Sequence, residues 1–345
     1  MGSTSSRETI AVILAAGKGM RMRSDFPKVL HPFMGRPMVS YVLEACKKAG
    51  INRILLVVGH GAELVRESLG SGYEYVKQPE QLGTGHALLM AAKALKGVKD
   101  DILVLAGDTP LLTPDILRKL IRHHKKTEAA ATMMTAVIDP PPAYGRIIRD
   151  QSGHVLRIVE ERDASVEEKK ITEVNTSHYC FQAEEVFPLL SLLKRDNDQK
   201  EYYLTDVIHL LVQRQKKVET LTPNDPRILI GINSRFELES AIKMFSKIII
   251  QKIINSGVTI IDSSSVYIEP DVKIEEDTVI YPFTSLMGKT TIGKDCVIGP
   301  QVKIIDGRIG DSCHIEFSVV ESRKIENGAT VGPFAYISNN KIKRG

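Results

Sequence analysis

A cluster of positive charge follows the first apolar run of the chain. Four cations lie within eleven residues of one another: Lys18, Arg21, Arg23 and Lys28. Like charges this close repel one another unless an anion lies between them. Gly17 and Gly19 open the same segment, and glycines let backbone N–H groups approach phosphate oxygens closely. The segment therefore indicates a phosphate-binding turn, although many glycine turns only link a strand to a helix.

Two common phosphate motifs do not fit this segment. The dinucleotide fingerprint GxGxxG fails because Met22 stands where its third glycine should be, and the P-loop pattern GxxxxGK[ST] is not matched. The predicted site is therefore a phosphate cradle of another kind.

The elements that must position this cradle alternate along the first two thirds of the chain. Near-continuous apolar runs at 9–16, 53–59 and 101–108 predict parallel strands covered on both faces. Between and after them lie predicted helices at 37–50 and 83–97, each ending at a glycine, and a third that starts at Thr113 as N-cap, with Pro114 and Asp115 in its first turn. Alternating strands and helices predict right-handed βαβ units and an α/β fold.

Strand-like segments with little helix between them occupy residues 129–182, which predicts an added mixed portion of the sheet. A helix over about 234–255 then leads to a different pattern. Aliphatic residues recur every six positions without a break: Ile268, Ile274, Ile280, Leu286, Ile292, Ile298 and Ile304. After a one-residue slip the period resumes at Ile309 and Ile315, and again at Ile325, Val331 and Ile337. A period of six is typical of a β-helix of hexapeptide repeats.

These patterns divide the chain into five parts. The predicted parts are a tail (1–7), an α/β domain (8–233), a linker helix (234–257), a short β-helix (258–338) and a second tail (339–345). The N-terminal MGSTSS formally fits a myristoylation pattern, but a disordered Ser/Thr tail is the simpler interpretation.

Composition excludes several classes of protein. The apolar share of 43% and charged share of 26% are ordinary for a globular protein, and a net charge of +4 without long runs of one sign argues against a nucleic-acid-binding surface. No apolar run approaches the ~20 residues of a membrane span. The four cysteines lack CxxC or zinc spacing, which predicts reduced structural thiols and a cytoplasmic protein.

Eight motifs in order carry a family resemblance. Residues 14–30, LAAGKGMRMRSDFPKVL, resemble the L-A-A-G-x-G-T-R-x(n)-P-K segment of the sugar-1-phosphate nucleotidyltransferases. The others are EQLGTGHA (80–87), LAGDTPLL (105–112), YGRI (144–147), IVEERDA (158–164), EVNTSHY (173–179), EYYLTDVI (201–208) and GINSR (231–235). Together with the hexapeptide tail they resemble the N-acetylglucosamine-1-phosphate uridylyltransferases. The resemblance implies a Rossmann-like nucleotidyltransferase domain with a mixed sheet, followed by a short left-handed parallel β-helix.

The resemblance also implies a role for individual residues. The catalytic cations would be Arg21, at the β- and γ-phosphates of UTP, and Lys28, at the α-phosphate and sugar phosphate. The implied nucleotide-binding residues are Leu14, Ala15, Ala16, Gly17, Gln78, Gly83, Thr84, Ala106, Gly107 and Asp108. The implied ligands of the Mg²⁺ cofactor are Asp108 and Asn233, and the implied sugar contacts are Gly145, Glu160, Asn175 and Asn233. Without the resemblance, Asp108 before Pro110 could be a turn aspartate and Glu160 a solvated charge.

The implied chemistry needs no nucleophile or catalytic histidine. A sugar 1-phosphate is mostly dianionic at pH 7, because its second pKa lies near 6. Its oxygen can attack the α-phosphorus of UTP in line, and cations, backbone N–H groups and Mg²⁺ offset the repulsion between the two polyanions.

Several alternatives stay open. Ser177 and His178 stand where the family usually has Gly-Ile, so the substrate could be another sugar 1-phosphate, such as glucose 1-phosphate, or another nucleotide. A non-catalytic sugar-nucleotide sensor is a further alternative. His178 could touch substrate, but a structural histidine is the simpler interpretation. The resemblance places the family's acetyl-transfer residues in later coils of the β-helix, so we expect no acetyltransferase activity, and we expect a homotrimer through the β-helix.

Overall fold

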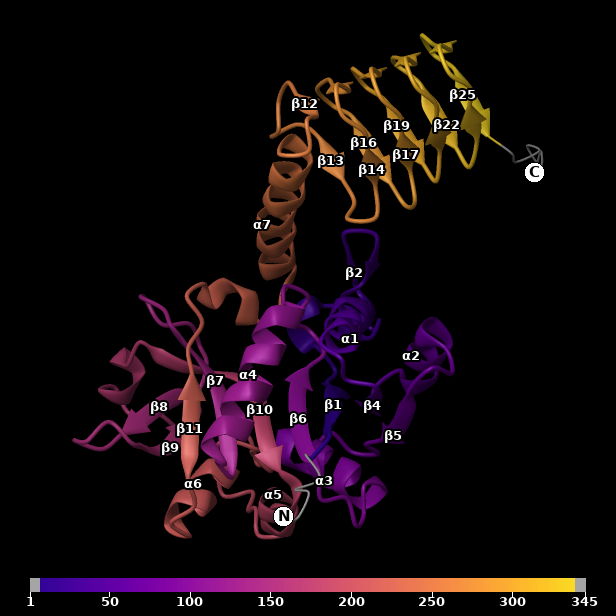
Figure 1. Cartoon of the computed structure of the whole chain (residues 1–345). Coiled ribbons are helices and arrows are strands. Elements are labelled where there is room, and N and C mark those ends of the chain that lie inside the picture. Colours follow the sequence, from indigo (N-terminus) through magenta and orange to yellow (C-terminus); the bar gives the residue numbers. More distant parts are fainter. Residues whose placement is uncertain (1–6, 339–345) are drawn as a thin grey trace, which may run out of the picture. The chain divides into compact units, whose positions relative to one another are not determined.

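The computed structural model describes residues 7–338, which form two compact units (Figure 1). The first unit holds residues 7–32 and 36–235, and the second holds residues 33–35 and 236–338. The predictions made for residues 1–6 and 339–345 lie outside the described residues.

A mixed sheet of nine strands forms the centre of the first unit. Its strands are β1 (Thr9–Ala15), β4 (Arg53–Val58), β5 (Glu74–Lys77), β6 (Asp101–Ala106), β7 (Ala131–Val137), β8 (Arg146–Arg149), β9 (Val155–Val159), β10 (Glu173–Gln182) and β11 (Val218–Leu221). The main order is β11-β7-β10-β6-β1-β4-β5, and β8 and β9 form a hairpin attached to β10. Strands β1, β4, β5 and β6 are parallel, whereas β10 is antiparallel to both β6 and β7. The predicted mixed sheet is confirmed.

Helices pack against both faces of this sheet. They are α1 (Met38–Lys48), α2 (Ala62–Leu69), α3 (Thr84–Ala94), α4 (Pro114–Thr127), α5 (Ala183–Leu190) and α6 (Asp206–Gln213). Alternate residues of β1 belong to different cores: Ile10 and Val12 to the core that includes α3, α5 and α6, and Ala11 and Ile13 to the core that includes α1, α2 and α4. This burial on both faces explains the near-continuous apolar runs.

The start of α4 follows the expected capping chemistry. The hydroxyl of Thr113 accepts a hydrogen bond from the backbone N–H of Ile116, and Pro114 occupies the first turn. The predicted strand at 101–108 is shorter in the structure, because the chain leaves β6 after Ala106. Gly107 then donates its N–H to the carbonyl of Leu14 over 3.0 Å. That early exit brings Asp108 to the carboxyl end of the parallel strands.

The second unit contains a helix and a stack of short coils. Helix α7 (Arg235–Ile254) precedes strands of two or three residues: β12 (Thr259–Ile260), β13 (Tyr267–Ile268), β14 (Lys273–Ile274), β15 (Val279–Ile280), β16 (Ser285–Met287), β17 (Thr291–Ile292), β18 (Val297–Ile298), β19 (Lys303–Ile305), β20 (Arg308–Ile309), β21 (His314–Ile315), β22 (Val319–Glu321), β23 (Lys324–Ile325), β24 (Thr330–Val331) and β25 (Tyr336–Ser338). These strands form three parallel sheets, which are the three faces of the stack.

The hexapeptide period becomes a column of stacked aliphatic side chains. Ile268 pairs with Leu286, and Leu286 with Ile304, at an offset of eighteen residues. Ile304 then pairs with Val320, so the offset shortens where the sequence period slips. All four side chains are fully buried. The predicted β-helix of hexapeptide repeats is confirmed.

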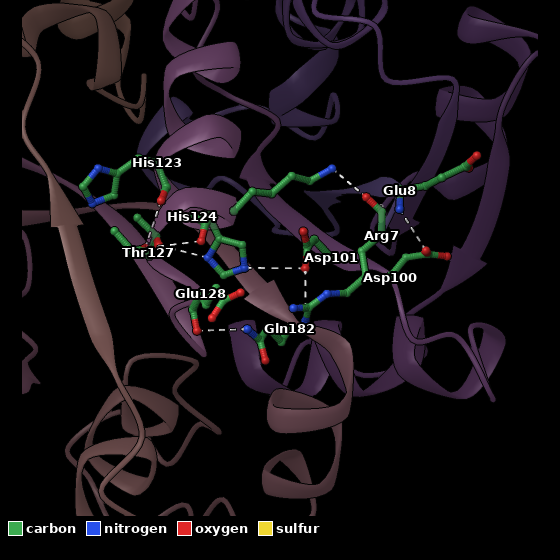
Figure 2. Close-up of polar contacts among 11 residues, drawn as sticks. Arg7, Glu8, Asp100, Asp101, His123, His124, Thr127, Glu128 and Gln182 are labelled. Carbon is green, nitrogen blue, oxygen red and sulfur yellow. Dashed lines mark hydrogen bonds and ion pairs between the residues drawn. The ribbon is translucent and has the colours of Figure 1, made fainter. Parts of the chain in front are cut away.

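A buried polar cluster lies at the opposite end of β6 from Asp108. The carboxylate of Asp101, the first residue of β6, lies 3.6 Å from Nε2 of His124 and 3.7 Å from Arg7 (Figure 2). The other ring nitrogen of His124 is hydrogen bonded to the hydroxyl of Thr132. Since Asp101 and His124 are almost fully buried, we interpret this cluster as part of the packing of α4 on the sheet.

Two further findings bear on the composition of the chain. All four cysteines are buried and free, as predicted, and burial raises the pKa of the Cys46 thiol to about 12. Over residues 7–338, none of the helices has the length and apolarity that a bilayer crossing requires.

Candidate active site

The turn after β1 brings its glycines close to the cationic segment. Gly19 has a left-handed backbone (φ 63°), and a Cβ atom there would lie 2.7 Å from Cβ of Lys28. A side chain at position 19 would therefore displace Lys28. Lys18 and Arg21 are exposed at this turn, whereas Met22 is buried beneath it.

Lys28 joins two residues that are distant in sequence. Its ammonium forms an ion pair with the carboxylate of Asp108 and donates a 2.9 Å hydrogen bond to Oδ1 of Asn233. The side chains of Lys28 and Asp108 are 15% and 13% exposed, so the pair is largely shielded from water yet open on one side. The structure therefore brings together three residues that the resemblance assigns to catalysis and metal binding.

The GINSR segment is anchored at this position by backbone contacts. Ile232 donates its N–H to the carbonyl of Asp108 over 2.9 Å, and the side-chain amide of Asn233 donates to the carbonyl of Gly231. The Tyr144 hydroxyl donates to the Gly231 carbonyl and accepts from the Gly231 N–H. A Cβ atom at Gly231 would lie 3.2 Å from the Asp108 carboxylate, so the chain passes very close to that group.

The residues predicted to bind nucleotide form two groups. In the first, Gly107 packs against β1: a Cβ atom there would lie 3.1 Å from the Leu14 carbonyl and 3.5 Å from Cβ of Ala15. In the second, Gln78 is buried after β5 and donates its amide N–H to the carbonyl of Gly83, just before Thr84 begins α3.

The predicted sugar contacts Gly145, Glu160 and Asn175 lie together: Gly145 directly precedes β8, Glu160 directly follows β9, and Asn175 is on β10. Asn175 donates its backbone N–H to the Gly145 carbonyl, and a Cβ atom at Gly145 would lie 3.4 Å from the Glu160 carboxylate. Glu160 accepts a hydrogen bond from the Thr205 hydroxyl. Burial raises the pKa of the Glu160 carboxyl, and the Thr205 hydrogen bond opposes that shift in part.

A bulge in β10 follows Asn175 and contains the two residues that depart from the family pattern. The register with β7 shifts between Asn175 and Tyr179, and Ser177 has a left-handed backbone (φ 60°). The amide N–H₂ of Asn175 donates to the Tyr179 hydroxyl, and its carbonyl accepts from the Ser177 N–H. The bulge thus fixes the orientation of the Asn175 side chain.

His178 connects the bulge to the loop that carries Asp108. Its Nε2 lies 3.1 Å from the hydroxyl of Thr109, and its Nδ1 lies 3.3 Å from the hydroxyl of Thr176. The ring is fully buried, and burial lowers the pKa of His178 to about 4, although the charge of Asp108 opposes that shift. A neutral, hydrogen-bonded ring agrees with the interpretation of His178 as a structural residue.

Thr109, Tyr144 and Thr205 are site residues that sequence reasoning missed. All three lie inside motifs quoted for the resemblance, LAGDTPLL, YGRI and EYYLTDVI. Each acts through another residue: Thr109 through His178, Tyr144 through Gly231 and Thr205 through Glu160. Such partners have no spacing signal of their own, because they are defined by contacts across the fold.

Comparison with known proteins agrees with this architecture. The family model for the MobA-like NTP transferase domain matches residues 11–200, and the model for the bacterial transferase hexapeptide (six repeats) matches residues 271–306.

Curated relatives match nearly the whole chain. The bifunctional protein GlmU of Caldanaerobacter subterraneus is 46% identical over 335 residues, which cover 97% of this chain and 73% of that protein. GlmU of Brevibacillus brevis is 45% identical over 327 residues, covering 95% and 71%, and GlmU of Carboxydothermus hydrogenoformans is 46% identical over 326 residues, covering 94% and 73%. The resemblance to the N-acetylglucosamine-1-phosphate uridylyltransferases is thereby confirmed, and this chain belongs to the GlmU family.

Proposed function

We infer that this chain transfers UMP from UTP to N-acetylglucosamine 1-phosphate, giving UDP-N-acetylglucosamine and pyrophosphate. Membership of the GlmU family supports this reaction. The observation that carries it is the convergence of Lys28, Asp108 and Asn233 at the carboxyl end of the parallel strands, where open α/β sheets bind their ligands.

The residues proposed for phosphoryl chemistry are cations rather than nucleophiles. The exposed Arg21 would bind the β- and γ-phosphates, and Lys28 would neutralise charge that develops around the α-phosphate. The dianionic sugar phosphate attacks in line without a general base, so orientation and charge neutralisation supply most of the catalysis.

We propose Mg²⁺ as the divalent cofactor, held by Asp108 and Asn233. The donor set fits, since a carboxylate and an amide oxygen are hard oxygen ligands and both already contact one cation, the Lys28 ammonium. When bound, Mg²⁺ would neutralise phosphate charge. The expected test is a metal titration: Asp108→Asn and Asn233→Ala should each raise the Mg²⁺ concentration for half-maximal rate, and an unchanged titration would remove that residue from the ligand set.

Gln78 offers a basis for choosing uracil. Its side-chain N–H₂ donates to the carbonyl of Gly83, and among the described residues no hydrogen bond is made to its side-chain oxygen Oε1. That oxygen can accept a hydrogen bond from N3–H of uracil, which cytosine lacks. We therefore propose that Gln78→Ala reduces discrimination between UTP and CTP. Equal discrimination in the variant would mean that other groups select the base.

The choice of sugar needs its own test, because Ser177 and His178 lie in the bulge that orients Asn175. Measuring pyrophosphate release from UTP with N-acetylglucosamine 1-phosphate, glucose 1-phosphate and galactose 1-phosphate decides among them. We expect the acetylated sugar to have the highest kcat/KM. No release from any pair, with UDP-sugar still bound, would indicate a sensor rather than an enzyme.

Oligomerisation and acetyl transfer concern the β-helix. We propose a homotrimer, because the coils expose large aromatic side chains at Phe283, Phe334 and Tyr336. Sedimentation equilibrium at micromolar concentration should give three times the chain mass, and a monomer would contradict the proposal.

We also propose no acetyl transfer by the coils of residues 259–338. Their single histidine, His314, is exposed on a two-residue strand, and the resemblance places the acetyl-transfer residues in later coils. Incubation with acetyl-CoA and glucosamine 1-phosphate should release no CoA thiol above background.

A further inference from the structure

The same two oxygen-bearing side chains, Asp108 and Asn233, contact the Lys28 ammonium and are also the proposed ligands of Mg²⁺. The Lys28 ammonium contacts the Asp108 carboxylate and Oδ1 of Asn233. These are the two groups proposed to hold the divalent metal. An ammonium and a metal ion cannot both occupy this position, since like charges at contact distance repel strongly where water is partly excluded.

We propose that the Lys28 ammonium is a built-in competitor of the metal, and that metal binding displaces it from Asp108 and Asn233 toward the substrate phosphates. This inference rests on the proposed function, because it takes the metal ligands from there. It adds a mechanism that links the arrival of the metal–nucleotide complex to the release of the catalytic lysine.

The burial of the Asp108 carboxylate explains why a cation must be bound there at every stage, first the Lys28 ammonium and then the metal. The Asp108 side chain is only 13% exposed, and a partly buried carboxylate without a cation is costly. Lys28 supplies the compensating charge in the arrangement described here, and the metal would supply it during turnover. The carboxylate is thus paired before and after the exchange.

The side chain of Lys28 is suited to such an exchange. Its Cβ is confined against Gly19, whereas its ammonium is carried on a flexible four-carbon stem with three rotatable donors. Displacement therefore requires only rotation of the stem. The nearby cations Lys18 and Arg21 are exposed to solvent, whereas the side chain of Lys28 is largely shielded from it.

The first test measures metal binding without nucleotide or sugar. Titration of the full chain with Mn²⁺, followed by electron paramagnetic resonance of the free ion, gives the metal Kd. We expect Lys28→Met to tighten binding by at least about tenfold, equal to about 1.4 kcal/mol. Lys18→Met is the matched control, because it removes a nearby exposed charge without touching either oxygen, and it should change the Kd by less than about twofold.

Each outcome separates the competition from the underlying metal assignment. An unchanged Kd in Lys28→Met, or equal tightening in Lys18→Met, would overturn the competition. The double variant Lys28→Met with Asp108→Asn should lose the gain. If it keeps the gain, or if none of the proteins binds Mn²⁺, the ligand assignment of the proposed function fails as well. Circular dichroism spectra that match the original chain verify that each variant is folded.

The second test follows the lysine itself in the unaltered protein. Acetylation by a water-soluble N-hydroxysuccinimide ester, read by peptide mass spectrometry, reports how accessible each amine is. We expect saturating Mg²⁺ to increase the labelling rate of Lys28 several-fold while Lys18 stays constant. Constant labelling of Lys28 at a Mg²⁺ concentration that saturates the site would contradict displacement.

Discussion

Two carboxylates of the site, Asp108 and Glu160, have opposite surroundings. Asp108 faces the ammonium of Lys28, whereas Glu160 accepts a hydrogen bond from Thr205 and is surrounded by other carboxylates. Burial raises the pKa of Glu160, and the negative charges of Asp206, Asp163 and Glu201 raise it further. The first carboxylate is therefore suited to cations and the second to hydrogen bonds with sugar hydroxyls.

Replacing Glu160 should have opposite effects on the stability of the fold and on the binding of sugar 1-phosphate. Because its folded pKa is raised above the usual 4.5, charging Glu160 destabilises the fold as the pH rises through the window above 4.5. Glu160→Gln should thus raise the unfolding temperature at pH 7.5 and lose that advantage near pH 4. Its KM for sugar 1-phosphate should rise by about tenfold or more, because a charged acceptor is lost. Calorimetry at both pH values and steady-state kinetics measure the two effects; a lower unfolding temperature at pH 7.5 would contradict the account.

Ser177 occupies a backbone conformation that favours glycine. At φ 60° a side chain costs about 1–2 kcal/mol relative to glycine, the residue that the family resemblance implies at this position. Ser177→Gly should leave the free energy of unfolding unchanged or raise it by up to about 1 kcal/mol, since strain relief exceeds the added chain entropy. Ser177→Val should lower it by about 1–3 kcal/mol. Urea unfolding compares both, and a Val variant as stable as the Gly variant would show that the bulge relaxes freely.

At the scale of elements, the pattern of apolar residues predicted those strands and coils whose inward positions are buried. Strands β1, β4 and β6 were recognisable because both their faces are buried, and the β-helix because its inward positions repeat every six residues. Helices α2, α5 and α6 were not predicted, since each has only eight residues and few turns to display a period.

The candidate site was predicted through the family resemblance rather than through physical pattern. The contact of Lys28 with Asn233 joins residues 205 positions apart, and no local spacing encodes such a pair. Likewise the bulge at Ser177 arises from pairing with β7, which a single strand sequence does not reveal. The family resemblance in the sequence therefore identified the site residues, whereas the proposed competition between Lys28 and the metal for Asp108 could be inferred only from the folded structure.

The corners of the β-helix depend on individual glycines. Gly288 has a left-handed backbone (φ 64°), donates its N–H to Glu269, and leaves no space for a Cβ atom beside the carboxylate of Asp306. Gly328 has a similar φ of 70° but open space around it, which makes it a matched control. Gly328→Ala should cost about 1 kcal/mol from backbone strain alone, and Gly288→Ala about 2–4 kcal/mol because of the added clash.

Hydrogen–deuterium exchange measures the local stability around each mutated position, in peptides that cover 285–310 for Gly288→Ala and in peptides that cover 319–338 for Gly328→Ala. Faster exchange is expected for Gly288→Ala than for Gly328→Ala, compared at the mutated coil in each case. Equal acceleration would mean that backbone conformation, not crowding at Asp306, limits this corner.

At the scale of the whole molecule, the two units share no apolar core: the first has a core on each face of its sheet, and the second has one of its own. Ligands of the first unit should therefore stabilise that unit alone. UTP with Mg²⁺ at about 100 times Kd should add about 2.7 kcal/mol to the unfolding of the first unit, and leave the exchange protection of the β-helix unchanged. Exchange rates measured across both units with and without ligand test this, and equal protection of the coils would show that the units unfold together.

The changing offset along the aliphatic column has a consequence for how such a domain can evolve. Neighbouring strands pair at an offset of twenty residues between β12 and β15, of eighteen in the next coils and of sixteen or seventeen later, yet the inward side chains stay in register. The corners therefore absorb deletions that would flip every side chain of an ordinary strand. A domain built in this way can gain or lose whole coils, and the proposed catalytic residues of the first unit would not change.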